Sequence, residues 1–214
     1  MSQPLVFAGA SNVLNVNLPN GTIGFSEKIA TSLGLQLVKL ATVGASNDFL
    51  LRSVYNYIQT ETPKLLIVTW QTWEREEWEY LGEYYQINAS GDDVLPDALQ
   101  TQYKQWVIKY NPDNNKTLGK QLHEKIWTLH QELIKKGIPH VFYNEMYPFV
   151  HSKDQQKDWG KSFIGPYNND LSFYWYLINV ANIKPDDAWY HFGPAGHCAW
   201  ADFLINYIKK NKIL

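Results

Sequence analysis

The sequence contains a single cysteine, Cys198, and this scarcity excludes a disulfide within the chain. The six histidines and the cysteine show no zinc-ligand spacing, so we expect no bound metal, and no motif calls for another cofactor. A lone cysteine also fits a reducing compartment. Without disulfides or metals, we expect stability to come from apolar packing and hydrogen bonds, and any catalysis to come from ionisable and polar side chains.

Long apolar runs and strong net charge are also missing. No run approaches the roughly 18 residues that cross a bilayer, and the N-terminus lacks the pattern of a signal peptide. We therefore expect a cytoplasmic protein without membrane contact. The 19 basic and 21 acidic residues leave a net charge of -2. This balance predicts no strong attraction to nucleic acid.

The 214 residues are 45% hydrophobic, which predicts one globular domain over 1–214. Aromatic residues make up 15% of the chain. Such a content serves a core first, but it also suits contacts with carbohydrate or with a protein partner.

Apolar segments alternate between strand-like and helix-like patterns. The alternation predicts an α/β fold with a mostly parallel sheet of four or five strands and helices on both faces. Expected strands are 5–8, 35–41, 64–70 and 139–143. Expected helices are 24–33, 46–58, 117–136, 170–180 and 196–210.

The alternation is interrupted over about 76–112 by a segment rich in Trp, Tyr and Glu. We interpret it as an insertion over the carboxyl edge of the sheet, part loop and part helix (about 96–110). A lid and an oligomer contact are equally compatible with it.

Two chemistry-bearing motifs lie at opposite ends of the chain. Gly9-Ala10-Ser11 follows the first strand, and His191 follows the acids Asp186 and Asp187 just before the last helix. Ligands bind at the carboxyl ends of parallel strands, so these segments are expected to meet there. A serine, a histidine and an acid are the parts of a nucleophile, a general base and its orienting group. His197 is the rival base, and Asp186 rivals Asp187.

These motifs resemble the SGNH, or GDSL-like, hydrolase superfamily. The family's Gly-Asp-Ser is matched by Gly9-Ala10-Ser11, its second-block glycine by Gly44, and its Asp-x-x-His-Pro by Asp187 through His197. The segment 68–76 is also similar to SGNH-like proteins of phages. The resemblance implies a three-layer α/β/α sandwich of flavodoxin-like type.

The family's roles, carried onto this chain, make Ser11 the nucleophile, His191 the general base and Asp187 its orienting acid. The backbone N–H groups of Ser11 and Gly44 would form an oxyanion hole. Asn47 or Gln71 is a possible side-chain donor, and Arg75 a possible contact for an anionic substrate.

The sequence departs from the family at several positions. Ala10 replaces the aspartate of the first block, and Phe192 replaces the proline after the histidine. Residues 70–73 (Trp-Gln-Thr-Trp) replace the third block, so its oxyanion-binding asparagine is missing.

Two hypotheses of function follow. The first is a serine esterase that hydrolyses an acyl ester of a small molecule or carbohydrate, for example an O-acetyl group on a sugar. The second is a catalytically inactive structural or binding protein, for example a component of a phage particle. The altered blocks and the aromatic-rich insertion favour the second hypothesis, and a homo-oligomer or virion contact is a further expectation about partners.

Overall fold

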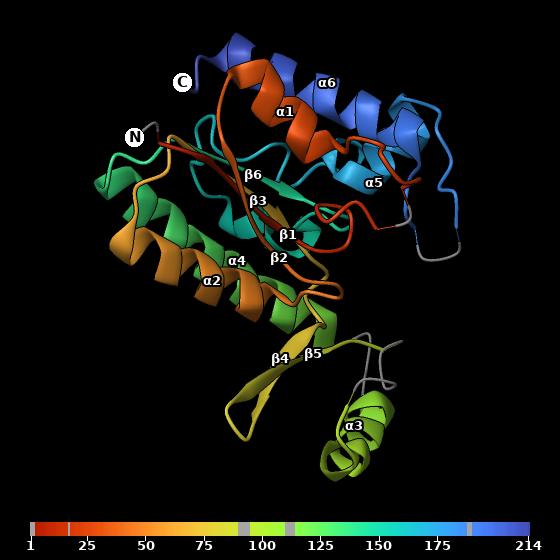
Figure 1. Ribbon diagram of the computed structural model, residues 1–214. Coiled ribbons are helices and arrows are strands. Elements are labelled where there is room, and N and C mark those ends of the chain that lie inside the picture. Colours follow the sequence, from red (N-terminus) through yellow and green to blue (C-terminus); the bar gives the residue numbers. More distant parts are fainter. Residues whose placement is uncertain (1–2, 17, 90–94, 110–113, 188–189) are drawn as a thin grey trace.

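The computed structural model describes residues 3–16, 18–89, 95–109, 114–187 and 190–214 (Figure 1). Its main sheet has four strands, all parallel, in the order β2-β1-β3-β6. The strands are β1 (Leu5–Gly9), β2 (Leu37–Ala41), β3 (Leu65–Trp70) and β6 (His140–Asn144). The predicted parallel sheet is confirmed, with boundaries shifted by one or two residues.

Helices cover both faces of this sheet (Figure 1). One face carries α1 (Phe25–Leu33), the short α5 (Phe173–Trp175) and α6 (Pro194–Asn211). The other carries α2 (Asn47–Thr60) and α4 (Asn114–Lys135). The fold is therefore a three-layer α/β/α sandwich, as the sequence predicts. None of the described helices has the length and apolar character needed to cross a membrane.

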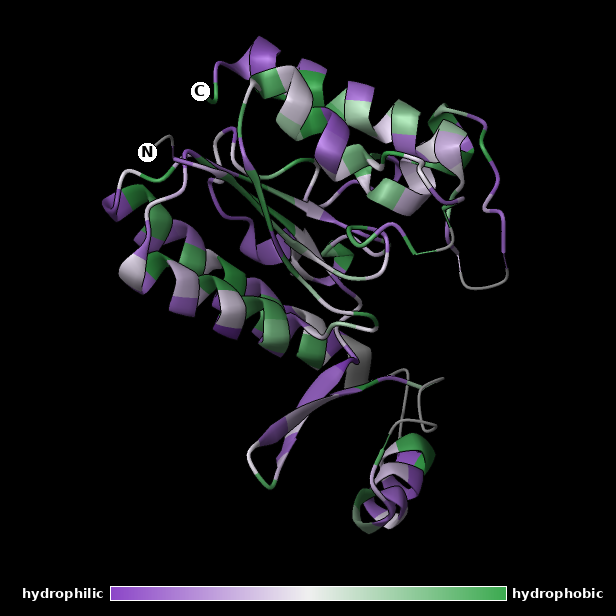
Figure 2. Ribbon diagram, viewed as in Figure 1, coloured by the Kyte–Doolittle hydropathy of each residue, from purple (hydrophilic) through white to green (hydrophobic). Residues whose placement is uncertain are grey.

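The central strands are apolar throughout because both of their faces are covered. Successive side chains of a strand point to opposite faces. Val6 and Ala8 accordingly enter the core beneath α2 and α4, whereas Leu5 and Phe7 enter the core beneath α1 and α6. Hydrophobic positions therefore mark the inner layer in Figure 2. Packing on both faces holds the sheet rigidly, and with it the carboxyl ends of the strands, where the candidate site lies.

The helix boundaries follow local signals in the chain. Gly34 ends α1 in the left-handed conformation (φ 66°), which glycine adopts without the usual steric cost. Ser46 caps α2, because its hydroxyl accepts a hydrogen bond from the Phe49 N–H at 3.1 Å. Pro194 occupies the first turn of α6, where its missing N–H costs no hydrogen bond.

The predicted helix over 170–180 is confirmed only in part, over 173–180. The segment divides into a 3₁₀ turn (Asn169–Leu171), the single turn of α5, and a π-helical turn (Tyr176–Val180). Ser172 lies between the first two in an extended conformation (φ -76°, ψ 156°), which interrupts the helical hydrogen-bond series. Another 3₁₀ segment, Val150–Gln155, follows β6.

The insertion contains a β-hairpin that the sequence patterns did not predict. Strands β4 (Glu76–Tyr80) and β5 (Glu83–Ile87) pair antiparallel. Their two-residue turn, Leu81-Gly82, has positive φ at both positions (52° and 83°), as tight hairpins require. Leucine is uncommon there, so the usual Asn-Gly or Asp-Gly signal was missing.

A helix, α3 (Asp97–Lys109), follows the hairpin, within the helix expected over about 96–110. Residues 90–94 and 110–113 of the insertion lie outside the described residues. In Figure 1 the hairpin and α3 project away from the central sheet, and Figure 2 shows the hairpin to be largely hydrophilic.

Candidate active site

Ser11 stands just past the carboxyl end of β1, in the first turn of the following loop. The N–H of Val13 and that of Leu14 both bond to the Ala10 carbonyl, at 3.0 and 3.3 Å, so the chain turns immediately after the strand. Gly9 permits this turn, because a Cβ there would lie 2.4 Å from the side chains of Thr69 and Val13. Ala10, where the family has aspartate, is buried in the core.

His191 links Ser11 to Asp187. Its Nε2 lies 3.0 Å from Ser11 Oγ, and its Nδ1 lies 2.7 Å from Asp187 Oδ2. Asp187 Oδ1 also accepts the backbone N–H of His191 at 3.1 Å. With the Nδ1 proton donated to the carboxylate, Nε2 is the acceptor for the serine hydroxyl. Three residues spread over 180 positions thus form one continuous hydrogen-bonded series.

The loop before α6 is fixed on both sides of His191. The Asp186 N–H donates to the His191 carbonyl at 2.8 Å. Phe192 is buried and packs edge-on against Phe173, with ring centroids 5.4 Å apart. Phe192 therefore anchors the loop where the family has proline. The Asp186 carboxylate lies beside Gly193 rather than at the imidazole, so Asp187 is the acid that meets the ring.

The structure places His191, and not the rival His197, within hydrogen-bond distance of Ser11. His197 is fully buried and accepts the Phe25 N–H on Nδ1 at 3.2 Å. Its ring packs on the Phe25 ring, with centroids 5.1 Å apart. Burial lowers the pKa of His197 to about 4. His197 therefore joins the first turn of α6 to the start of α1.

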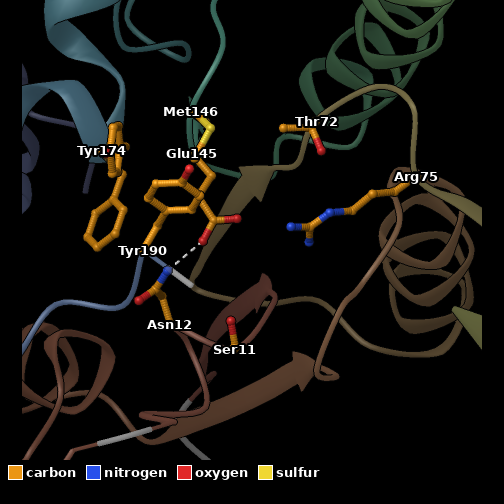
Figure 3. Close-up of a pocket in the computed structure, with 9 residues that line it drawn as sticks. Ser11, Asn12, Thr72, Arg75, Glu145, Met146, Tyr174 and Tyr190 are labelled. Carbon is orange, nitrogen blue, oxygen red and sulfur yellow. Dashed lines mark hydrogen bonds between the residues drawn. The ribbon is translucent and has the colours of Figure 1, made fainter. Parts of the chain in front are cut away.

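A pocket of about 50 Å³ opens beside Ser11 (Figure 3). It is lined by Ser11, Asn12, Thr72, Arg75, Glu145, Met146, Phe173, Tyr174 and Tyr190. These residues come from the loops after β1, β3 and β6, from α5, and from the loop before α6. The carboxyl edge of the sheet is therefore the place where the candidate chemistry gathers, as expected for parallel strands.

Asn47 and Gln71 have tasks other than the expected donation to an oxyanion. Asn47 Nδ2 donates to the carbonyls of Gln71 and Thr72, both at 3.1 Å, and Asn47 Oδ1 accepts the Gln71 N–H at 2.8 Å. Both amide hydrogens of Asn47 are thus used on the backbone. Gln71 Nε2 donates to the Thr69 carbonyl at 3.2 Å. The two buried amides hold the chain just after β3 in place.

Arg75 reaches the pocket wall, as expected for a substrate contact. Gly44 has the left-handed conformation (φ 68°), and a Cβ there would lie 3.0 Å from Asn88 Nδ2. Glycine is therefore required at this turn after β2. Its N–H as an oxyanion donor stays a prediction.

The sequence patterns gave no role to Glu145, Tyr174 or Tyr190, which also line the pocket. Glu145 accepts a hydrogen bond from Asn12 Nδ2 at 2.7 Å. Tyr174 and Tyr190 pack edge-on with centroids 5.2 Å apart, and Figure 3 shows both on one side of the pocket. Glu145 follows a buried strand, and this strand-end position was the available signal. The sequence carries no such signal for Tyr174 and Tyr190, because only tertiary packing brings these two residues to the pocket.

Across the described residues, no group of three or more His, Cys, Asp or Glu side chains is arranged to hold a metal ion.

The whole fold resembles solved structures. A crystal structure of TesA, an SGNH hydrolase, superposes with a TM-score of 0.52 at 13% identity, covering 99% of this chain and 100% of that chain. This chain has the SGNH fold. A carbohydrate esterase family 2 enzyme with a carbohydrate-binding domain, from Corynascus thermopiles (Myceliophthora fergusii), superposes with a TM-score of 0.46 at 13% identity, covering 99% and 67% of the two chains. No family model matches the sequence, and no curated protein matches it by sequence.

The order of strands in the sheet accounts for the position of the Ser11–His191–Asp187 series. β1 lies in the middle of the sheet, between β2 and β3, so its carboxyl end is flanked by loops from both neighbours. The loop before α6 reaches the same edge, and the pocket forms between these segments.

Proposed function

We propose that the protein is a serine ester hydrolase of SGNH type, with Ser11 as nucleophile, His191 as general base and Asp187 as the acid that orients the imidazole. One observation carries the proposal: the His191 ring lies between Ser11 Oγ at 3.0 Å and Asp187 Oδ2 at 2.7 Å. A serine hydroxyl is a weak nucleophile at neutral pH unless a base accepts its proton as it attacks.

The reaction runs in two half-reactions. Ser11 Oγ attacks the ester carbonyl carbon while its proton passes to His191 Nε2, and the resulting oxyanion collapses to release the alcohol, which takes that proton. Water then attacks the acyl-serine with His191 again as base, and the carboxylic acid leaves. Asp187 stabilises the imidazolium and holds its Nδ1 proton in both halves.

The pocket favours a small acyl group and a polar alcohol. Its volume of about 50 Å³ is a third of the ~150 Å³ cavity that encloses benzene in an engineered protein. An acetyl group suits this space better than a long acyl chain. Glu145 offers hydroxyl acceptors, and Tyr174 offers an aromatic face, and both suit a sugar. A carbohydrate O-acetyl ester is therefore the substrate class that we propose.

The test is covalent labelling with a fluorophosphonate probe together with hydrolysis of p-nitrophenyl acetate. Wild-type protein should be labelled on Ser11 and should release p-nitrophenol. Ser11→Ala should abolish both while the circular dichroism spectrum stays unchanged, because a turn at a strand end tolerates the loss of one hydroxyl. The exposed Ser32→Ala in α1 is the matched control and should behave as wild type.

The rival proposal is an SGNH-fold protein without activity, used as a structural or binding component. Two observations favour it: residues 70–73 replace the third block, and the side-chain amides of Asn47 and Gln71 donate to backbone carbonyls. Wild-type protein that neither takes up the probe nor hydrolyses acetyl, butyryl and aryl esters would replace the esterase proposal with this one.

A further inference from the structure

Arg75 forms hydrogen bonds with the segments that follow β2 and β3, the two strands on either side of β1. The sheet order places β1 between β2 and β3. Arg75 Nη1 donates to the carbonyl of Ala45, in the loop after β2, at 3.3 Å. It also donates to Oε1 of Gln71, just after β3, at 3.0 Å. These two hydrogen bonds hold Nη1 between the loop after β2 and the end of β3, and Arg75 lines the same pocket as Ser11.

Further hydrogen bonds hold Gln71, the residue that accepts a hydrogen bond from Arg75. Gln71 is 3% exposed, and its backbone N–H is held by Asn47 Oδ1 at 2.8 Å. Gln71 Nε2 is fixed on the Thr69 carbonyl, which leaves Oε1 directed at Arg75. Asn47, Gln71 and Arg75 therefore form a series that ends in the pocket beside Ser11.

Arg75 has unused donors and no compensating acid. Two acceptors on Nη1 leave Nη2 and Nε without a partner among the described residues, and no described carboxylate lies within ion-pair distance of Arg75. Figure 3 shows the guanidinium extending into the pocket, towards the space between Ser11 and Glu145. The chain's other arginine differs, since Arg52 pairs with both carboxylate oxygens of Glu77 at 2.7 and 2.9 Å.

We infer that Arg75 supplies the side-chain donor of the oxyanion hole, an inference that rests on the proposed esterase function. When Ser11 Oγ bonds to the carbonyl carbon, the electron pair of the C=O π bond moves onto the oxygen, and the charge develops beside the free guanidinium N–H groups. Donors fixed before the reaction act most strongly there, and a charged donor forms a stronger hydrogen bond than a neutral amide. Arg75 thus takes the role that an asparagine has in the third block of the family.

The experiment measures kcat and KM separately for Arg75→Lys and Arg75→Ala. The substrates are neutral p-nitrophenyl acetate and the mono-p-nitrophenyl ester of succinic acid, which carries a carboxylate. Loss of one oxyanion donor lowers kcat by about 100-fold or more, so Arg75→Ala should do so on both esters with little change in KM. Arg75→Lys should retain part of the rate. Added guanidinium ion should restore part of the Arg75→Ala rate.

Arg52→Lys is the matched control, because it changes the other arginine outside the pocket, and its kcat should stay at the wild-type value. The rate of fluorophosphonate labelling should fall with kcat in Arg75→Ala, since the phosphonyl oxygen occupies the same hole. Guanidinium rescue separates lost chemistry from lost folding, because a misfolded variant would not recover.

The outcomes separate this inference from the proposed function. An active wild type whose kcat is unaffected by Arg75→Ala would overturn the oxyanion role alone. A loss confined to KM for the succinate ester would overturn it too, and would make Arg75 the anchor of a substrate anion. A wild type that neither hydrolyses esters nor takes up the probe would overturn the esterase function and this role with it.

Discussion

His191 depends on its immediate neighbours for its orientation. Tyr190, just before it, has the left-handed conformation (φ 67°), which costs a residue with a side chain about 1–2 kcal/mol. The ring of Tyr190 packs on Tyr174, and Phe192 on the other side is buried. Packing therefore compensates for backbone strain at the position that turns the imidazole towards Ser11, a pattern typical of functional sites.

Asp187→Asn tests the orienting role of the carboxylate. An amide lacks the charge that stabilises the imidazolium, and its NH₂ group can favour the wrong tautomer of the ring, so we expect kcat to fall by up to about 10⁴-fold, the loss known for the equivalent change in a serine protease. Some orientation of the ring survives, so the loss should be smaller than for Ser11→Ala. Steady-state hydrolysis of p-nitrophenyl acetate is the measurement.

Asp186→Asn is the control for this change. Its carboxylate lies beside Gly193 and its contact with His191 runs through the backbone, which the substitution keeps. Turnover should therefore remain near that of wild type. Equal losses in the two variants would contradict a specific role for Asp187.

The insertion is joined into one unit by Glu76 on β4. Its Oε1 accepts the indole N–H of Trp106 on α3, and its Oε2 accepts that of Trp78 on its own strand, both at 2.8 Å. Tyr103 stacks on Trp106 and donates to the Asn88 carbonyl at 2.8 Å. A small core of Ile87, Leu95 and Tyr103 lies between hairpin and helix.

Glu76→Ala should loosen α3 without disturbing the central sheet. A hydrogen bond to a charged group contributes about 1.5–3 kcal/mol, so amide hydrogen exchange in α3 should quicken by roughly tenfold or more. Exchange in β1 and β3 should stay slow. Glu79→Ala, at an exposed position of the same strand, is the control and should leave α3 unchanged. Uniformly faster exchange in sheet and helix would contradict the view of the insertion as a separate unit.

Four histidines are buried in the body of the protein. His123, His130, His140 and His197 are each at most 3% exposed. Burial lowers the pKa of all four, to about 4 for His140 and His197. His130 and His140 also contact each other, with Nδ1 and Nε2 2.7 Å apart, so both cannot hold a proton there without repulsion.

These histidines should make the folded state sensitive to mild acid. An unfolded histidine binds a proton near pH 6.5, whereas His140 and His197 in the folded state bind one only near 4. Between these values the unfolded state holds more protons, so the free energy of unfolding should be constant above about pH 6.5 and fall below it. The loss approaches about 3 kcal/mol for each of the two.

Urea unfolding at pH 7.5 and pH 5.0 measures this effect in a window where most carboxylates stay charged. The urea midpoint should be clearly lower at pH 5.0. His197→Asn keeps an acceptor for the Phe25 N–H but cannot be protonated, so its midpoint should change less between the two pH values. Equal midpoints for the wild type at both values would contradict the prediction.

Local patterns in the chain were sufficient for the central sheet and for part of the site. Residues 65–68 form a continuous apolar run, and such a run predicts a strand covered on both faces. Because parallel strands place their carboxyl ends at one edge, Ser11 and the loop of His191 were expected to meet although 180 residues separate them.

Tertiary packing decided the points that local patterns left open. His191 and His197 both stand near the start of the last helix, and the choice between them follows from the burial of Phe192 and from the packing of His197 on Phe25. The sequence offered Arg75 as a contact for a substrate anion, but its position in the pocket depends on acceptors from the loop after β2 and from the end of β3. Such contacts join residues far apart in the chain, so the spacing of residues in the sequence does not predict them.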